Sequence, residues 1–134
     1  MVILHILQYL LDNGFGTAID IDLFFEDIPL GKNGIGIISR SGEAYINNRV
    51  TTQRFDIYCR EDSAALAVDK LEKIRLFFAD NYNNLCTLPI VPNVSTRQYK
   101  RVCITSLDGI ENLGIDDNSR IVFRLAGEIT FEKE

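Results

Sequence analysis

The stretch at positions 54–78, RFDIYCREDSAALAVDKLEKIRLFF, decides the fold because it predicts a strand that passes directly into a helix. Apolar and polar residues alternate from Arg54 to Cys59, which is the two-residue period of a strand with one buried face. Asp62 or Ser63 can accept a hydrogen bond from an early helical amide, so the helix is expected to begin without an intervening loop.

The helix of this unit has one charged side and one apolar side. On the charged side, Asp69 and Lys73 stand four residues apart in the favourable order, a pairing worth about 0.2 to 0.5 kcal/mol. The other side carries apolar residues at spacings of three and four, which predicts the surface that packs on a sheet. These residues are Ala64, Ala67, Leu71, Ile74 and Phe78.

The rest of the chain surrounds this unit with a second helix and further strands. Apolar spacing predicts a helix at 2–12, and alternation predicts strands at 19–25, 35–39, 101–107 and 120–131. One long strand, bent in the middle, is predicted from about residue 43 to 59. Turn-forming residues predict a hairpin tip at Ser41 and Gly42 and loops at 29–34, 92–100 and 108–118.

These elements predict an α+β fold in which an antiparallel or mixed β-sheet carries both helices on one face. With 134 residues, the chain is expected to form a single domain, 1–134. Hydrophobic residues make up 46% and charged residues 25%, and no apolar run reaches the roughly 18 to 20 residues that span a bilayer. We therefore expect a soluble protein that has no signal peptide and does not bind a membrane.

The three cysteines, Cys59, Cys86 and Cys103, form an odd set without a close pair. This spacing argues against a disulfide framework and against a thiolate zinc site, so the cysteines are interpreted as free core residues. The net charge of −5 also argues against tight nucleic-acid binding, because phosphate contacts need a broad positive surface.

Three groups of residues in the sequence are candidates for a chemical site. Carboxylates at 20–27 suit a hard cation, but two of them share one face of the predicted strand and no ligand-bearing turn joins them. His5 is the only histidine, and its neighbours supply no nucleophile, so we expect a surface or boundary residue. The acidic pair Asp116 and Asp117 is explained by turn formation. We therefore expect no catalytic, cofactor or metal site, and not an enzyme.

The outer face of the predicted sheet carries several apolar or amphipathic side chains, and an apolar sheet face suggests contact with another subunit. We predict an oligomer interface there, with five residues as candidates: Phe24, Tyr45, Tyr58, Val122 and Arg124. Ala126 adds to the same face.

The order of elements resembles the tail-terminator and minor capsid proteins of long-tailed bacteriophages, which act in tail completion and head-tail joining. The resemblance covers nearly the whole chain and rests on three segments: DIDLFFEDIP, the strand TTQRFDIYC entering the helix, and the terminal RIVFRLAGEITFEKE. It implies a structural virion protein at the head-proximal end of the tail, assembled in the host cytoplasm. It also implies a hexameric ring of identical copies that caps the tail-tube protein and contacts the head connector protein, with DNA only passing through the bore.

Two rival functions remain open from the sequence. One is a small metal-dependent enzyme that uses the acidic strand 20–27, and the other is an intracellular adaptor that binds one protein partner. Calorimetric titration with divalent cations tests the first rival, and a mass measurement in solution tests the second.

Overall fold

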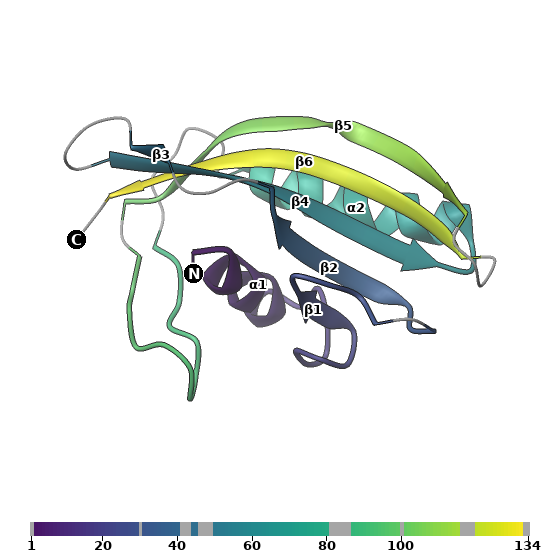
Figure 1. Cartoon of the computed structure of the whole chain (residues 1–134), viewed down its shortest axis with the longest axis horizontal. Helices are drawn as coiled ribbons and strands as arrows, with labels where there is room; N and C mark the ends of the chain where they lie inside the picture. Colours follow the sequence, from purple (N-terminus) through teal and green to yellow (C-terminus); the bar gives the residue numbers. More distant parts are fainter. Residues whose placement is uncertain are drawn as a thin grey trace.

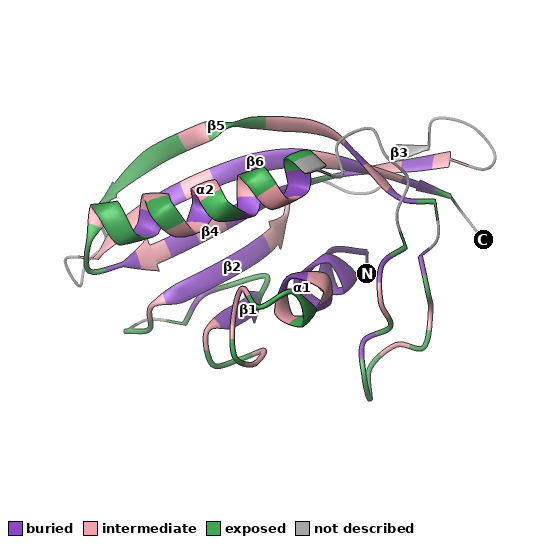
Figure 2. Cartoon of the chain, turned by 180° about the vertical axis from the view of Figure 1, so that it is seen from behind, coloured by how far each residue is buried: buried purple, intermediate pink, exposed green. Residues whose placement is uncertain are grey.

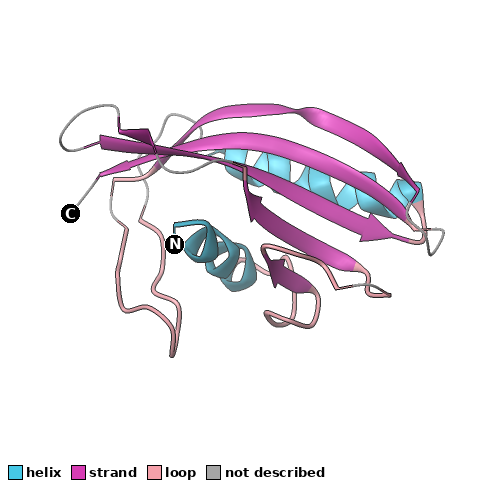
Figure 3. Ribbon diagram, in the orientation of Figure 1, coloured by secondary structure: helices cyan, strands magenta, loops and turns pink. Residues whose placement is uncertain are grey.

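The computed structural model describes residues 2–29, 31–40, 44–45, 50–80, 87–99, 101–115 and 120–132, with the side chains of 44, 45 and 80 not described. Two helices and a mixed sheet give the predicted α+β fold (Figures 1 and 3). In chain order, the elements are α1 (Val2–Asp12), β1 (Leu23–Phe25), β2 (Gly34–Ser39), β3 (Ala44–Tyr45), β4 (Val50–Glu61), α2 (Ala64–Asp80), β5 (Cys103–Ile115) and β6 (Ile121–Glu132).

The sheet is organised around the pairing of β4 with β6. These two strands run antiparallel without a register shift from Val50 opposite Glu132 to Glu61 opposite Ile121. The strand order is β1-β2-β4-β6-β5, and the short β3 pairs with β4 beside this path. Among the strands that the structure describes, β1 and β2 are the only parallel pair, so the sheet is mixed.

One apolar cluster joins the helices to the sheet. The predicted stripe of α2 is buried at Ala67, Leu71, Ile74 and Phe78, and Ala64 packs against the cluster. Helix α2 lies against β4, β5 and β6, whereas α1 lies beside β1 and β2 (Figure 2). That both helices share one face of the sheet stays a prediction.

The strand-to-helix unit begins its helix as predicted. The Oγ of Ser63 accepts a hydrogen bond from the Leu66 amide at 3.4 Å, which satisfies one of the early helical donors. Asp62, the other candidate cap, instead forms an ion pair with Arg120. On the solvated side, Lys73 lies 3.0 Å from Asp69, as their spacing predicted.

An ion pair between buried Glu61 and half-buried Lys70 joins the strand and the helix of this unit. Glu61, the last residue of β4, is buried and accepts a hydrogen bond from Nζ of Lys70 on α2. Partial burial, the largest single effect, would lower the pKa of Lys70, but the hydrogen bond to Glu61 and the negative charge of Glu61 together outweigh it and raise the pKa. The charge of Glu61 is therefore compensated where the helix crosses the strand.

The predicted strand at 19–25 is wrong for its first four residues. Only Leu23–Phe25 forms a strand, and the chain before it turns back on itself, with amides of 21–23 donating to the carbonyl of Ala18. Asp20 has a φ of 72°, a left-handed conformation that breaks a strand and that aspartate tolerates better than most residues. The alternation of apolar and acidic residues at 19–22 therefore belongs to a tight turn and not to a strand.

Two further boundaries differ from the prediction. The long strand expected from residue 43 to 59 is two strands, β3 and β4, which pair with each other antiparallel, Ala44 opposite Thr52. The turn expected at 108–118 is wrong up to Ile115, because β5 continues to that residue through three register shifts. Glycine at 114, with a φ of 100°, fits a bulge as well as a turn. The predicted hairpin tip and residues 116–119 lie outside the described residues.

Among the residues that the structure describes, no helix is both long and apolar enough to cross a membrane.

We expect Leu71→Ala to lower the free energy of unfolding by about 2 to 5 kcal/mol, because Leu71 is fully buried between α2 and the sheet and its removal leaves a cavity. Leu76→Ala is the matched control on the same helix, since 58% of that residue is exposed. Denaturant melts of both variants measure the difference. Equal losses below about 0.5 kcal/mol would show that the buried side of α2 is assigned wrongly.

Candidate interaction surface

Two of the carboxylates at 20–27, those of Asp22 and Glu26, hold neighbouring segments of the chain in place. The carboxylate of Asp22 accepts hydrogen bonds from the amides of Thr17 at 2.9 Å and Ala18 at 3.2 Å, and from the Thr17 hydroxyl. Burial opposes ionisation of Asp22, but these donors outweigh it and lower the pKa of the group. Asp22 therefore closes the turn before β1.

Glu26 has a comparable role on the other side of β1. Its Oε1 accepts from the Ser39 hydroxyl at 2.8 Å and so joins the end of β1 to the end of β2. Within the described part of the chain, no group of three or more histidine, cysteine, aspartate or glutamate residues is arranged to hold a metal ion. The pair Asp116 and Asp117 lies outside the described residues.

His5 is fully buried, so the expectation of a surface or boundary histidine is wrong. Its Nδ1 lies 2.7 Å from the Pro89 carbonyl oxygen and its Nε2 lies 3.1 Å from Oγ of Ser95. The imidazole also meets the Tyr99 ring edge-on, with centroids 4.8 Å apart. His5 thus connects α1 to the segment 87–99, which we call the arm.

The described cysteines are free, as predicted. Cys59 is fully buried on β4, and burial raises the pKa of its thiol to about 12. Cys103 is half-buried, and burial raises its pKa as well. Cys86 lies outside the described residues.

The structure brings three of the five predicted interface residues into one row across the outer sheet face. The register places Phe24 beside Gly36, Gly36 beside Tyr58, and Tyr58 beside Arg124. Tyr58 and Arg124 are half-buried, and Arg124 forms an ion pair with Glu111 of β5. The row therefore reaches the β5 edge of the sheet.

Phe24 is in the predicted place but is not available to a partner, because only 2% of it is exposed. The segment after β1 folds over this part of the face, and Ile28 lies so close to Gly36 that a Cβ there would meet its side chain at 2.7 Å. Ala126 is also buried, so its assignment to an exposed face is wrong as well. Val122 is half-buried, and the side chain of Tyr45 lies outside the described residues.

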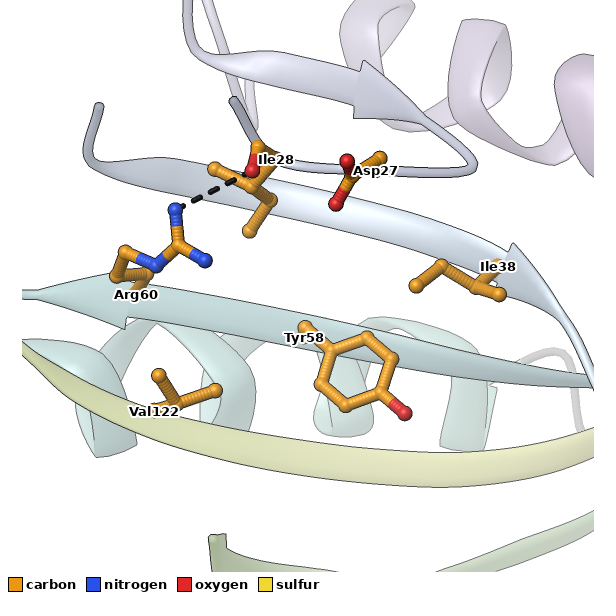
Figure 4. Close-up of a pocket in the computed structure, with 6 residues that line it drawn as sticks. All are labelled: Asp27, Ile28, Ile38, Tyr58, Arg60 and Val122. Atoms are coloured by element: carbon orange, nitrogen blue, oxygen red, sulfur yellow. Dashed lines mark hydrogen bonds between the residues drawn. The ribbon is translucent and has the colours of Figure 1, made fainter. Parts of the chain in front are cut away.

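Beside this row is an open hollow of about 210 Å³, which we call the outer-face hollow (Figure 4). Nη1 of Arg60 donates to the carbonyls of Ile28 and Pro29 at its rim. The hollow is lined by both apolar and polar side chains, and the two carbonyls hold the guanidinium of Arg60 in place. Its size and lining suit a single apolar side chain of a partner, placed beside that guanidinium. The lining residues are Asp27, Ile28, Ile38, Tyr58, Arg60 and Val122.

A more exposed apolar region lies along α2 and β5, and sequence reasoning missed it. Four large apolar side chains there are more than two-fifths exposed: Leu66, Leu76, Leu113 and Ile115. Leu113 and Ile115 fell within the predicted turn, where the glycines concealed a continuing strand. On α2, Leu66 and Leu76 lie outside the predicted apolar stripe. Their position among the charged residues of the helix was the sequence signal that could have revealed this exposed region.

Comparison with known proteins finds no match, either among protein-family models or among curated proteins.

The buried histidine predicts a pH dependence. Burial lowers the pKa of His5 from its ordinary value of 6.5, the Pro89 carbonyl opposes this effect, and nearby positive charge, including Arg97, adds to it. A pKa depressed in the folded state means that the stabilising effect is complete above about pH 6.5 and is lost as the pH falls toward the folded-state value.

We therefore expect the free energy of unfolding of the wild type to fall more steeply than that of His5→Gln between about pH 7.5 and 5. His5 is the only histidine, so the difference between the two proteins isolates its titration. Urea melts across this range measure it. A difference that stays constant with pH would contradict the assigned burial.

Proposed function

We propose that this chain is a structural assembly protein whose copies join edge to edge into a closed ring, and that it acts as a tail terminator of a long-tailed bacteriophage. The observation that carries the proposal is the open edge of β5. The phage role comes from the resemblance of its order of elements to tail-terminator proteins.

β5 is a long edge strand with a free side. This 13-residue strand pairs with β6 along one side, and no other described strand pairs with it. Leu113 is 41% exposed and Ile115 is 70% exposed at its far end. A strand of this length with unpaired backbone groups and apolar side chains can be extended by a neighbouring chain.

The bulges of β5 favour a specific contact over indiscriminate pairing. Three register shifts interrupt its ladder with β6, at 104–106, 107–110 and 112–114. Bulges bend an edge and remove the regular spacing that a generic strand would need. A partner must therefore match this shape, as an identical copy in a repeated head-to-tail contact does.

A ring of this kind fits the terminator role. In the proposed assembly, about six copies repeat the contact with one fixed rotation, and the loops at one end meet the tail tube while those at the other meet the head connector. The net charge of −5 per copy would keep DNA from adhering as it passes through the bore. The rival metal enzyme is less well supported, because Asp22 and Glu26 are engaged by backbone and hydroxyl donors.

We expect the protein to bind to one end of tubes formed by the tail-tube protein of the same phage and to stop their growth. Electron microscopy of tubes polymerised with and without the protein measures length and end density. The control is Asp12→Asn, an exposed position at the end of α1, outside β5 and the arm, at which capping should persist. Tubes of unchanged length with bare ends would overturn the terminator role and favour the adaptor.

A further inference from the structure

We propose that His5 is a pH-sensitive switch: its neutral imidazole holds residues 89–98, which we call the distal arm, against α1, and its protonated form releases them. The opening is local, because the helix-sheet core stays folded when the distal arm moves. The proposal goes beyond the ring assembly and does not depend on it.

The hydrogen bonds of His5 suit a neutral ring. A carbonyl oxygen can only accept, so Nδ1, 2.7 Å from the Pro89 oxygen, carries a hydrogen and donates it. In the neutral ring, Nε2 then has a lone pair that accepts from the Ser95 hydroxyl at 3.1 Å. The Oγ of Ser95 in turn accepts from the Arg97 amide at 3.3 Å. Donors and acceptors therefore alternate correctly across both branches of the arm.

A proton on Nε2 reverses one link of this chain. Nε2 becomes a donor, so the Ser95 hydroxyl has to accept from both the imidazolium and the Arg97 amide. Its own hydrogen then loses its acceptor. Protonation thus weakens the contact that joins α1 to the far branch of the arm.

The surroundings of His5 also disfavour a positive ring. The side chain is fully buried, and the charged groups that act on it are the α-amino group of the chain and Arg97, both positive. The guanidinium of Arg97 lies 4.1 Å from the centroid of the Tyr99 ring, and His5 meets the same ring at 4.8 Å. On α1 itself, the carboxylate of Asp12 accepts from the Gln8 amide. An imidazolium in the closed arm would therefore have no carboxylate partner among the described residues.

These effects set the direction of the switch. Burial lowers the pKa of His5, the Pro89 carbonyl opposes this effect, and the two positive charges add to it. An exposed histidine has an ordinary pKa near 6.5, so protons bind the open arm more readily than the closed one. The closed arm is therefore favoured fully above about pH 6.5 and progressively less as the pH falls below it.

The distal arm can move as one piece. The amides of Val91 and Ser95 each donate to the carbonyl of the other at 2.9 Å, and the Val94 amide donates to Val91 at 3.1 Å. Of residues 89–98, all of which the structure describes, Val91 alone is buried. Release therefore exposes one apolar side chain, whereas unfolding the core would expose the whole apolar cluster. Local opening is the less costly response to protonation.

The base of the arm gives this movement a fixed pivot. Leu88 and Tyr99 are both 2% exposed, and the Leu88 amide donates to the Tyr99 carbonyl at 2.8 Å. The Tyr99 ring also packs edge-on against Phe131 of β6. Figures 1 and 2 show the arm beside the start of α1, extending away from the sheet. Release turns the distal arm about this base and gives solvent access to the imidazole.

The test is an NMR titration of the full chain from about pH 7.5 to 5. His5 is the only histidine, so one set of imidazole signals reports its protonation. Nuclear Overhauser contacts between the imidazole and the Ser95 side chain, together with the Val91 methyl signals, show whether the distal arm is closed. The amide signals of β4 and β6 report on the core.

Two variants identify the titrating group. His5→Gln keeps one donor and one acceptor but cannot take up a proton. Asp12→Asn is the matched control, because it removes the titratable carboxylate of the same helix and leaves His5 intact.

We expect the His5–Ser95 contacts to weaken and the Val91 methyl signals to shift as the imidazole titrates, while the β4 and β6 signals stay in place. The ratio of open to closed arm should rise by up to about tenfold for each pH unit below 6.5. Asp12→Asn should behave like the wild type, and the arm signals of His5→Gln should stay constant.

Four results would overturn the switch. They are a distal arm that stays closed while His5 titrates, an imidazole that stays neutral over the whole range, arm signals that change equally in His5→Gln, and loss of the β4 and β6 signals together with those of the arm. If His5→Gln does not fold, the wild-type titration decides alone, because its single histidine supplies the midpoint that the arm signals must share.

Discussion

The antiparallel pairing of β4 with β6 is the constraint on which the rest of the structure depends. It runs over 12 residues of each strand without a register shift, so it fixes which side chains share a face. Phe55, Ile57 and Cys59 then stand beside their β6 partners under α2, and Glu61 meets Lys70 where β4 passes into the helix. A shift by one residue would turn the buried side chains of either strand to the wrong face.

The β4–β6 pair also determines which edge of the sheet remains unpaired. β2 and β1 extend the sheet on the β4 side, where the segment after β1 covers Phe24, while β5 extends it on the β6 side and remains an edge. The exposed apolar residues of α2 and β5 gather on the open side, and the arm projects on the other. The open β5 edge and the arm therefore lie on different sides of the β4–β6 pair.

Sequence patterns predicted the elements whose period is long and regular, namely both helices, β2, β4 and β6, and the α+β class. They failed where backbone conformation departs from a simple period. The alternation at 19–22 concealed a turn stabilised by Asp22, and the glycines at 109 and 114 suggested a turn where β5 is bulged. They also missed the interactions that bring together residues far apart in the chain, which is why His5, bonded to Pro89 and Ser95, was expected at the surface. Three of the five predicted interface residues, Phe24, Tyr58 and Arg124, share one row of the sheet, but the burial of Phe24 depended on the fold of 26–29, and the interface itself stays a prediction.

Amide hydrogen exchange on the free and assembled protein tests the central claim, that a stable β4–β6 centre leaves a β5 edge which a neighbouring copy completes. We expect the amides of β4 and β6 to exchange slowly in both states, through global unfolding. Peptides covering 108–115 should exchange quickly in the free protein and become protected when copies assemble on the tail tube. Equal exchange of 108–115 in the two states would contradict the claim.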